Sequence, residues 1–346
     1  MTVHRPLAAG AILGLHAQTS LHPGSGHGLG TVDLPIHRER HTQWPCVPGS
    51  SLKGILRDAC RSRLSLAEAA SPRESSAGAG QGSPTPLTLL FGAPAPAVSE
   101  ATGDADAEIG SPATPETAGA LSLTDARLLA FPVRSLKGVF AWTTCPAALE
   151  RFRRDAALAG IAVPWEIPAP PAHGAAIPEG SPCLIEGERI ILEEYDFPAS
   201  VAPEASQVAD WIASRLLCDD PAFAAAAERF RRGLVVLSDD DFTHFAKHAT
   251  EIVARIGLNY ETKTARKGAL FHQEFLPPET LLYSVVLANP ARSRRGQDGA
   301  SLLGLLDALL PSPAILQIGG EESIGKGYCA ARLVRDGRDE SSARSS

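Results

Sequence analysis

A long low-complexity stretch in the first third of the chain constrains its fold more than any other feature. Residues 69–119 are mostly Ala, Gly, Ser, Pro and Thr, and only 87–91 (LTLLF) are apolar enough to pack. Such a segment buries too little apolar surface to offset its chain entropy. We therefore predict an insertion that is largely disordered or loosely attached. A second stretch rich in Pro and Ala, at 164–182, is expected to be an exposed excursion.

Helical and strand patterns alternate between these interruptions. The clearest helix is predicted over 50–69, where Ser50 or Ser51 can cap its start and apolar residues recur at helical spacing. Strands are expected within 7–20, 121–145, 183–197, 234–238 and 280–287, and further helices at 205–218, 221–232 and 302–310. Interleaved elements with long loops and no internal repeat indicate an α+β fold with insertions rather than a regular doubly wound sheet. We expect one domain over 1–334 and a polar tail at 335–346.

Composition narrows the class of protein. With 346 residues and 44% hydrophobic content, the chain can bury a large core. No apolar run approaches the ~18 to 20 residues of a membrane span, so we expect a soluble protein with no membrane partner. The six cysteines form no CxxC pair, which favours neither a zinc site nor a disulfide framework. Reduced thiols in a cytoplasmic protein are the simplest interpretation.

The net charge of −7 first argues against a nucleic-acid binder, whose surface is usually basic. The distribution of charge changes that inference. Residues 69–119 contain six acidic residues and one basic residue, whereas residues 1–68 contain seven basic and four acidic residues. The N-terminal part is therefore basic, and the acidic total does not exclude RNA.

The predicted helix over 50–69 carries a row of cations. Lys53, Arg57 and Arg61 recur every four residues, and the preceding Pro-Gly-Ser-Ser sequence offers free N–H groups and hydroxyls at the positive end of the helix dipole. A polyanion would fit such a surface. An ordinary solvated helix face remains the alternative.

Histidines gather near the N-terminus. Four of them flank Asp33, at His22, His27, His37 and His41, and the loop at 21–30 contains four glycines. Backbone N–H groups, a titratable base and cations together suit phosphodiester chemistry, although loop histidines can also be merely solvated. His37 and His41 are spaced i, i+4, but two histidines without a third ligand are weak support for zinc.

A second glycine loop lies near the C-terminus. Residues 319–327 (GGEESIGKG) approach the nucleotide-binding P-loop pattern, but a glycine stands where Ser or Thr should bind magnesium, and Glu321 and Glu322 would repel phosphates. We therefore predict a tight turn that packs against another backbone or against RNA. Aromatic residues are only 5% of the chain, so base stacking on a sheet face is not indicated.

Several of these segments together resemble the RAMP superfamily of CRISPR proteins. Residues 21–58 (LHPGSGHGLGTVDLPIHRERHTQWPCVPGSSLKGILRD) resemble its N-terminal signature and look like the backbone subunit of type III-B, or Cmr, effector complexes. Three later segments agree with the family in order, at 121–146, 267–277 (KGALFHQEFLP) and 319–328. The matches span nearly the whole chain.

The resemblance implies a ferredoxin-like, RRM-type palm with an inserted thumb and finger-like regions, and we expect the thumb within 165–232. It implies copies of the chain stacked along a guide CRISPR RNA, together with other Cmr subunits. Complementary single-stranded target RNA would be cut at regular intervals. The resemblance also implies a divalent metal ion, Mg²⁺ or Mn²⁺, for cleavage, and no nucleotide or organic cofactor.

Individual residues can be matched to the family. Asp33 matches an essential loop aspartate and His22 a histidine of the same site. The implied reaction is attack of a ribose 2′-hydroxyl on the adjacent phosphate, in which Asp33 could hold a metal ion or orient the nucleophile and His22 could transfer a proton. The residues expected to contact RNA are Arg38, Ser50, Ser51, Lys53, Arg57, Gly319, Gly320, Gly325 and Lys326.

One segment departs from the family pattern. Gln273, Glu274 and Phe275 stand where the family commonly has Glu-Glu-Tyr, so a carboxylate and a hydroxyl are missing near the expected cutting site. Two functions therefore remain open: an endoribonuclease subunit that cuts target RNA, and a non-catalytic filament subunit that coats guide RNA. An enzyme that processes repeat precursors fits this signature less well.

Overall fold

The computed structural model describes residues 9–28, 30–70, 85–93, 118–290, 297–310 and 313–336, with the backbone alone for 67–70. Most of the predicted insertion at 69–119 and most of the polar tail at 335–346 lie outside these ranges.

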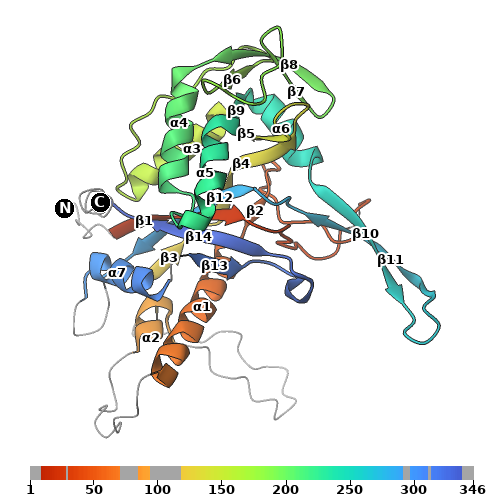
Figure 1. The fold of residues 1–346 in the computed structure, drawn as a ribbon. Coiled ribbons are helices and arrows are strands. Elements are labelled where there is room, and N and C mark those ends of the chain that lie inside the picture. The colour runs from red at the N-terminus through yellow and green to blue at the C-terminus, as the bar shows by residue number, and fades with distance from the viewer. Residues whose placement is uncertain are drawn as a thin grey trace, which may run out of the picture.

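A large mixed sheet forms the centre of the described structure (Figure 1). Its strands run in the order β13 (Ala314–Gln317), β14 (Tyr328–Val334), β1 (Ala9–Ala17), β12 (Leu281–Ala288), β4 (Ala126–Arg134), β5 (Phe140–Thr144), β9 (Leu234–Leu237), β6 (Ala175–Ile177), β8 (Tyr195–Val201) and β7 (Arg189–Leu192). Two short strands join it at the side, β2 (Cys46–Val47) on β4 and β3 (Leu121–Leu123) on β12. The pairs β5–β9 and β6–β8 are parallel, and the other pairs are antiparallel.

Helices pack against this sheet in two groups. The first comprises α1 (Gly49–Ala70), α2 (Pro86–Phe91), α6 (Asp239–His248) and α7 (Gly299–Leu309), and the second α3 (Pro146–Leu158), α4 (Pro203–Arg215) and α5 (Ala224–Gly233). Successive side chains of β1 point to opposite faces of the sheet, so this strand packs against both groups of helices. Leu13 and Leu15 lie in the core that contains α1 and α7, whereas Ile12 lies in the core that contains α3, α4 and α5. The predicted α+β architecture is confirmed.

The predicted helix over 50–69 is confirmed as α1, but its N-terminus differs from expectation. The helix begins at Gly49, whose N–H donates to Oδ1 of Asp125 at 2.8 Å. Ser50 and Ser51 therefore lie in the exposed first turn and do not act as the cap. The capping carboxylate comes from a residue 76 positions away, which local sequence patterns cannot indicate.

The prediction of an exposed excursion at 164–182 is wrong in part. Trp165 is 3% exposed, and all three residues of β6 are buried between β8 and β9. A three-residue strand between prolines is too short to show a recognisable alternation of apolar and polar residues.

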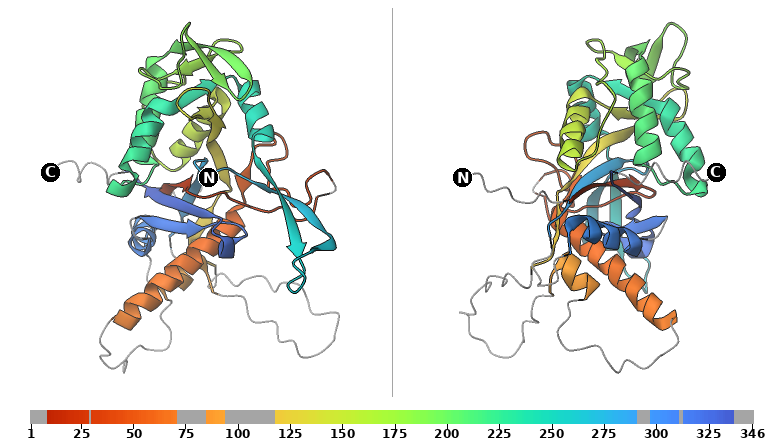
Figure 2. Two further views of the ribbon diagram at one scale, coloured as in Figure 1. Left: turned by 45° about the vertical axis from the view of Figure 1, so that its right-hand side comes forward. Right: turned by 90° about the vertical axis from the view of Figure 1, so that its left-hand side faces the viewer.

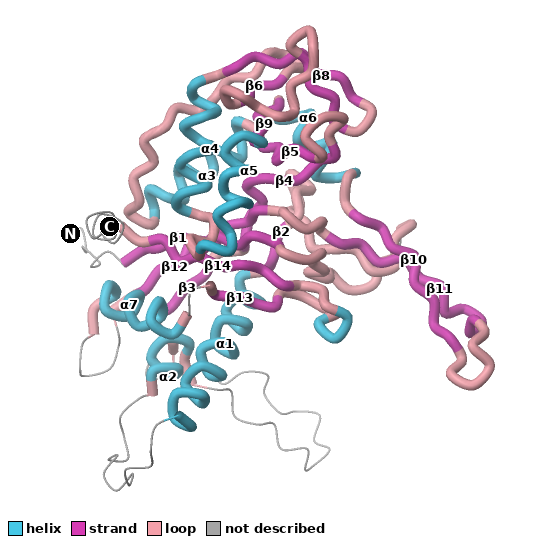
Figure 3. The backbone as a smooth tube through the Cα atoms, in the orientation of Figure 1, coloured by secondary structure: helices cyan, strands magenta, loops and turns pink. Residues whose placement is uncertain are grey.

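One element extends away from the body of the molecule. The strands β10 (Glu251–Leu258) and β11 (Ala265–Phe275) form a separate two-stranded hairpin that projects beyond the main sheet (Figures 1 and 2). Residues 165–232, within which we expect the thumb, form β6, β8 and β7 at one end of the main sheet, together with α4, the short 3-10 helix η1 (Pro221–Phe223) and α5 (Figure 3).

The cysteines lie in the interior of the structure. All six cysteines are buried free thiols. Burial raises the pKa of Cys60 to about 11, so this thiol is neutral at physiological pH. In the described ranges, no helix combines the length and the apolar character needed to cross a bilayer.

The aromatic cluster around Phe152 predicts where the second core is most sensitive. Phe152 is fully buried, and its ring lies 4.9 Å from that of Tyr283 and 5.5 Å from that of Trp211, between centroids. We expect Phe152→Ala to lower the free energy of unfolding by about 3–5 kcal/mol in urea denaturation, because it leaves a cavity. Leu158→Ala on the same helix, at a side chain that is 60% exposed, should change it by less than about 0.5 kcal/mol. Equal losses for the two variants would contradict this packing.

Candidate functional site

The histidine-rich loop at 21–37 folds back on itself. The N–H of His37 donates to the Pro23 carbonyl at 2.7 Å, and the N–H of Gly28 donates to the Asp33 carbonyl at 2.9 Å. Because its two arms pair with each other, His22 and Asp33 are held on neighbouring arms rather than on a free loop.

Main-chain hydrogen bonds join both arms to the edge of β11. The Leu34 N–H donates to the His272 carbonyl at 3.0 Å, and the Leu34 carbonyl accepts from the Glu274 N–H at 3.0 Å. At the other arm, Leu21 N–H donates to the Leu276 carbonyl at 2.9 Å. The position of both candidate catalytic residues therefore depends on the backbone of one strand.

Asp33 is an exposed carboxylate beside a histidine that sequence reasoning missed. Its Oδ2 accepts from the backbone N–H of His272 at 2.7 Å and lies 3.6 Å from Nδ1 of the same residue. The His272 side chain is 43% exposed, so both groups are accessible to a ligand. Asp33 and His272 are 239 residues apart, and no spacing signal links them.

His22 is held in a defined orientation. It is 8% exposed, and its Nδ1 lies 2.7 Å from the Glu274 carbonyl oxygen. Since a carbonyl only accepts, Nδ1 carries the proton and Nε2 of the neutral ring is free to accept one. The β11 contacts of His22 and Asp33 are two residues apart, which corresponds to about 7 Å along a strand.

A pocket of about 300 Å³ lies beside His22. It joins three segments that sequence analysis identified separately: the His22 loop, the start of α1 at Ser51, and the C-terminal glycine loop at Gly319 and Gly320. Gly319 has φ +85°, and a Cβ there would lie 2.3 Å from the His22 carbonyl oxygen. Only glycine fits this close approach.

One wall of the pocket is the start of α1. The exposed Ser50 and Ser51 lie in the first turn of α1, where backbone N–H groups lack helical partners and the helix dipole is positive. The Gly320 N–H donates to the His22 carbonyl at 3.1 Å, so it is not available to a ligand. Gly325 also has positive φ, at +79°, and ends the short 3-10 helix η2 (Glu322–Ile324).

The cations of α1 are less free than the sequence suggests. Lys53 Nζ donates to the Leu121 carbonyl at 2.9 Å, and Arg57 Nη2 donates to the Gly92 carbonyl at 3.2 Å. Burial and then the neighbouring Arg57 lower the pKa of Lys53. Arg61 is 55% exposed and pairs with Asp58 at 2.8 Å. The predicted contact of Lys53 and Arg57 with RNA stays a prediction.

Arg38 also points inward. Its Nη1 donates to the carbonyls of Gln43 and Ala246, each at 2.8 Å, and its Nη2 pairs with the Glu274 carboxylate. The same carboxylate accepts from the N–H of Ile36 at 3.0 Å. Arg38 thus holds the 21–37 loop against α6 and β11, and its predicted contact with a phosphate stays a prediction.

The departure from the family pattern lies in the interior. Gln273 and Phe275 are each 1% exposed. Gln273 Oε1 accepts from Arg255 Nη1 at 2.6 Å, and Phe275 lies under the ammonium group of Lys326 at 5.2 Å. Lys326 Nζ also donates to Ser20 Oγ at 3.1 Å. The ammonium group predicted to contact RNA is therefore bonded within the protein.

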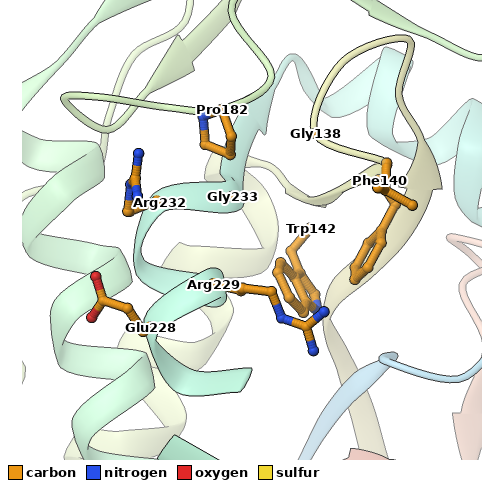
Figure 4. A pocket seen from close by; sticks show the side chains of 9 residues that line it. Gly138, Phe140, Trp142, Pro182, Glu228, Arg229, Arg232 and Gly233 are labelled. Carbon is orange, nitrogen blue, oxygen red and sulfur yellow. The ribbon is translucent and has the colours of Figure 1, made fainter. Parts of the chain in front are cut away.

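A second pocket is lined by residues from other segments of the chain, at 138–142, 182 and 228–233. It has a volume of about 270 Å³ and is lined by residues of β5 and α5, among them Phe140, Trp142 and Arg229 (Figure 4). It contains none of the sequence-predicted site residues.

Comparison with known proteins agrees with this fold. A family model described as the RAMP superfamily matches residues 15–330. The CRISPR system Cmr endoribonuclease Cmr4 of Pyrococcus furiosus is 34% identical over 326 residues, which cover 93% of this chain and 95% of that protein. Oligomeric Cmr4 from Pyrococcus furiosus has a similar crystal structure, with a TM-score of 0.65 and 27% identity, over 96% of this chain and 100% of that one.

A more distant structure shares the fold. A chain from the type III-B Cmr-beta complex bound to cognate target RNA superposes with a TM-score of 0.63 at 18% identity, over 95% of this chain and 98% of that one. The resemblance read from residues 21–58 is confirmed by these matches across nearly the whole length. The chain therefore belongs to the RAMP superfamily and, within it, to the Cmr4 family.

Proposed function

We propose that this chain is the backbone endoribonuclease of a type III-B Cmr effector, which binds guide RNA along a filament of its own copies and cuts complementary target RNA at regular intervals. The observation that carries the proposal is the meeting of His22, Ser51 and the 319–320 glycines around one pocket beside the Asp33 loop. The likeness to a relative named as an endoribonuclease supports the cutting of RNA, and the likeness to a relative crystallised as an oligomer supports the filament. The buried free thiols fit a reducing cytoplasm.

The site suits transesterification by the RNA itself. The 2′-hydroxyl of the cut nucleotide attacks the adjacent phosphorus, the P–O2′ bond forms, and the P–O5′ bond breaks to give a 2′,3′-cyclic phosphate and a 5′-hydroxyl. His22 Nε2 has the free lone pair needed to take the 2′-hydroxyl proton. Exposed N–H groups at the start of α1 offer partners for the phosphate oxygens.

A divalent metal ion belongs to the proposal. Mg²⁺ is often held by one or two carboxylates together with substrate phosphates and water, and Asp33 is an exposed carboxylate beside the site. Among the described residues, no group of three or more His, Cys, Asp or Glu side chains could form an all-protein metal site. Asp33 would therefore share the ion with RNA, where it would neutralise charge that develops on the phosphate.

The β10–β11 hairpin is the element that suits the thumb. Large apolar side chains are exposed along it, among them Tyr260 at 82% and Leu270 at 60%. Its distal part also carries exposed cations at Lys263, Arg266 and Lys267. Apolar and basic groups on a projecting ribbon suit insertion between stacked bases and contact with the flanking phosphates.

Asp33 gives the first test of cleavage. We expect Asp33→Asn in the reconstituted complex to reduce the rate of target cleavage by roughly 10²-fold or more, while guide and target RNA stay bound. The measurement is single-turnover cleavage with analysis of the terminal phosphate. Asp58→Asn, which removes the same charge from an exposed position on α1, serves as the control. Undiminished cleavage by Asp33→Asn would show that this residue is not part of the reaction.

The non-catalytic alternative has its own signature. Gln273 and Phe275 lack the carboxylate and hydroxyl expected at those positions, and this keeps a purely structural filament subunit in consideration. A complex of the unaltered chain that binds target RNA but never cuts it, with Mg²⁺ or Mn²⁺ supplied, would establish that alternative. Cleavage of repeat RNA by the isolated chain would instead indicate an RNA-processing enzyme.

Removal of metal gives the second test. We expect EDTA to abolish target cleavage and added Mg²⁺ or Mn²⁺ to restore it, because Asp33 and the phosphate share the ion. Target binding should be retained in EDTA, as measured by filter binding. Cleavage that proceeds at the same rate in EDTA would refute the metal requirement and leave the RNA-binding role intact.

The start of α1 gives the third test. Ser51→Asp places a negative charge in the first turn of α1, beside the pocket. The same charge should weaken guide RNA binding, because it faces the phosphate site. Ser65→Asp is the matched control, since it adds the same charge about 21 Å further along the helix. If the two variants bind guide RNA equally well, the start of α1 does not contact phosphate.

A further inference from the structure

A polar cluster connects the base of the projecting hairpin to the C-terminal glycine loop. Arg255 on β10 donates through Nη1 to Gln273 Oε1 on β11 at 2.6 Å and pairs with Glu321 Oε1 at 2.7 Å. Gln273 Nε2 lies 3.4 Å from the same Glu321 oxygen. The three side chains form a closed triangle.

The triangle contains one carboxylate, and it comes from the glycine loop. Gln273 occupies the buried corner and contributes a hydrogen bond without charge, whereas Glu321 supplies the negative charge. Arg255 and Glu321 are only 28% and 26% exposed. Removal of either partner would leave a partly buried charge without its counterion. Hydrogen bonding from Arg255 lowers the pKa of Glu321, so the carboxylate is ionised at neutral pH.

Glu321 is joined directly to the backbone that holds His22. It follows Gly319 and Gly320, and the Gly320 N–H donates to the His22 carbonyl. Glu321 itself has φ +70°, a left-handed conformation that a non-glycine residue rarely adopts without compensation. Its ion pair with Arg255 provides that compensation, because it anchors the strained residue from outside the loop.

A second connection crosses the same gap. Lys326, at the far end of the glycine loop, donates to Ser20 Oγ at 3.1 Å, and Ser20 Oγ donates to Glu251 Oε2 on β10 at 2.8 Å. The glycine loop is therefore connected to the hairpin at two points, through Arg255 and through Glu251. A shift of the hairpin would be transmitted to the loop that positions this histidine.

We propose that Glu321 is a positioning residue for target cleavage, which holds the glycine loop and His22 in place through Arg255, and that position 273 can supply the carboxylate in its stead. The inference rests on the proposed function and adds to it a link between the hairpin and the cutting site. Small misplacements of catalytic groups cost rate rather than affinity, and a shift of about 1 Å can cost roughly 10²-fold.

A reciprocal rescue tests this proposal in the assembled complex. We expect Glu321→Gln to lower the single-turnover rate of target cleavage roughly ten- to hundredfold, with the Kd for target RNA changed less than about twofold. Adding Gln273→Glu should return the rate to within about threefold of the unaltered chain, because Arg255 regains a carboxylate at its Nη1. Glu322→Gln is the control, since it removes the neighbouring exposed carboxylate of the same loop.

Arg255→Gln removes the cation of the same ion pair, on the hairpin side. It should give a similar loss of rate, and Gln273→Glu should not rescue it, because the cation is gone. A merely structural role for Glu321 would lower thermal stability without this pattern of selective rescue. The proposal is overturned if Glu321→Gln cuts as fast as Glu322→Gln, or if Gln273→Glu fails to restore the rate in a folded double variant. Failure of the proposed function is distinct, because the unaltered complex itself would then not cut.

Discussion

Main-chain hydrogen bonds to β11 determine where both arms of the 21–37 loop lie. Leu34 pairs with this strand, Leu21 pairs with Leu276 directly after it, and the Glu274 carbonyl also fixes the His22 ring. Backbone pairing positions side chains more tightly than contacts between long side chains, since little rotamer freedom remains. The same strand forms half of the projecting hairpin. One strand therefore connects the element that suits the RNA duplex to the residues proposed to act on it.

The cations of the site divide into two kinds. Arg38, Lys53 and Arg57 donate to backbone carbonyls or to a buried carboxylate, and in doing so they hold segments that are distant in sequence. Lys263, Arg266 and Lys267 lie exposed on the hairpin, where phosphates can reach them. Charge counted along the sequence does not separate these roles, because both kinds of cation occur in basic runs. At the pocket itself, the start of α1 presents the exposed residues Ser50 and Ser51 rather than a free cation.

The sequence predicts local structure well where the pattern is long, and poorly where distant segments meet. The helix over 50–69 is found within one residue at each end, because its apolar residues recur at helical spacing over several consecutive turns. The short strand β6 was missed, and the cap of α1 by Asp125 could not be foreseen from local residues. The resemblance identified Asp33 and His22, and the structure adds His272, Arg255 and Glu321, which come from elements that no spacing connects to them. Long-range pairing, rather than composition, brings these groups together.

The glycine loop at 319–327 shows why a near match to a known motif can mislead. Its glycines do not surround a nucleotide phosphate. Gly319 allows the loop to approach the His22 backbone, and Gly325 ends η2 in a left-handed conformation. The acidic residue that argues against phosphate binding by this loop is the one that pairs with Arg255. Glu321 therefore has a consistent physical role once its partner on the hairpin is known: it gives a strained loop an external anchor and balances a half-buried cation. The loop that carries it contacts the His22 backbone and forms part of the wall of the pocket beside this histidine.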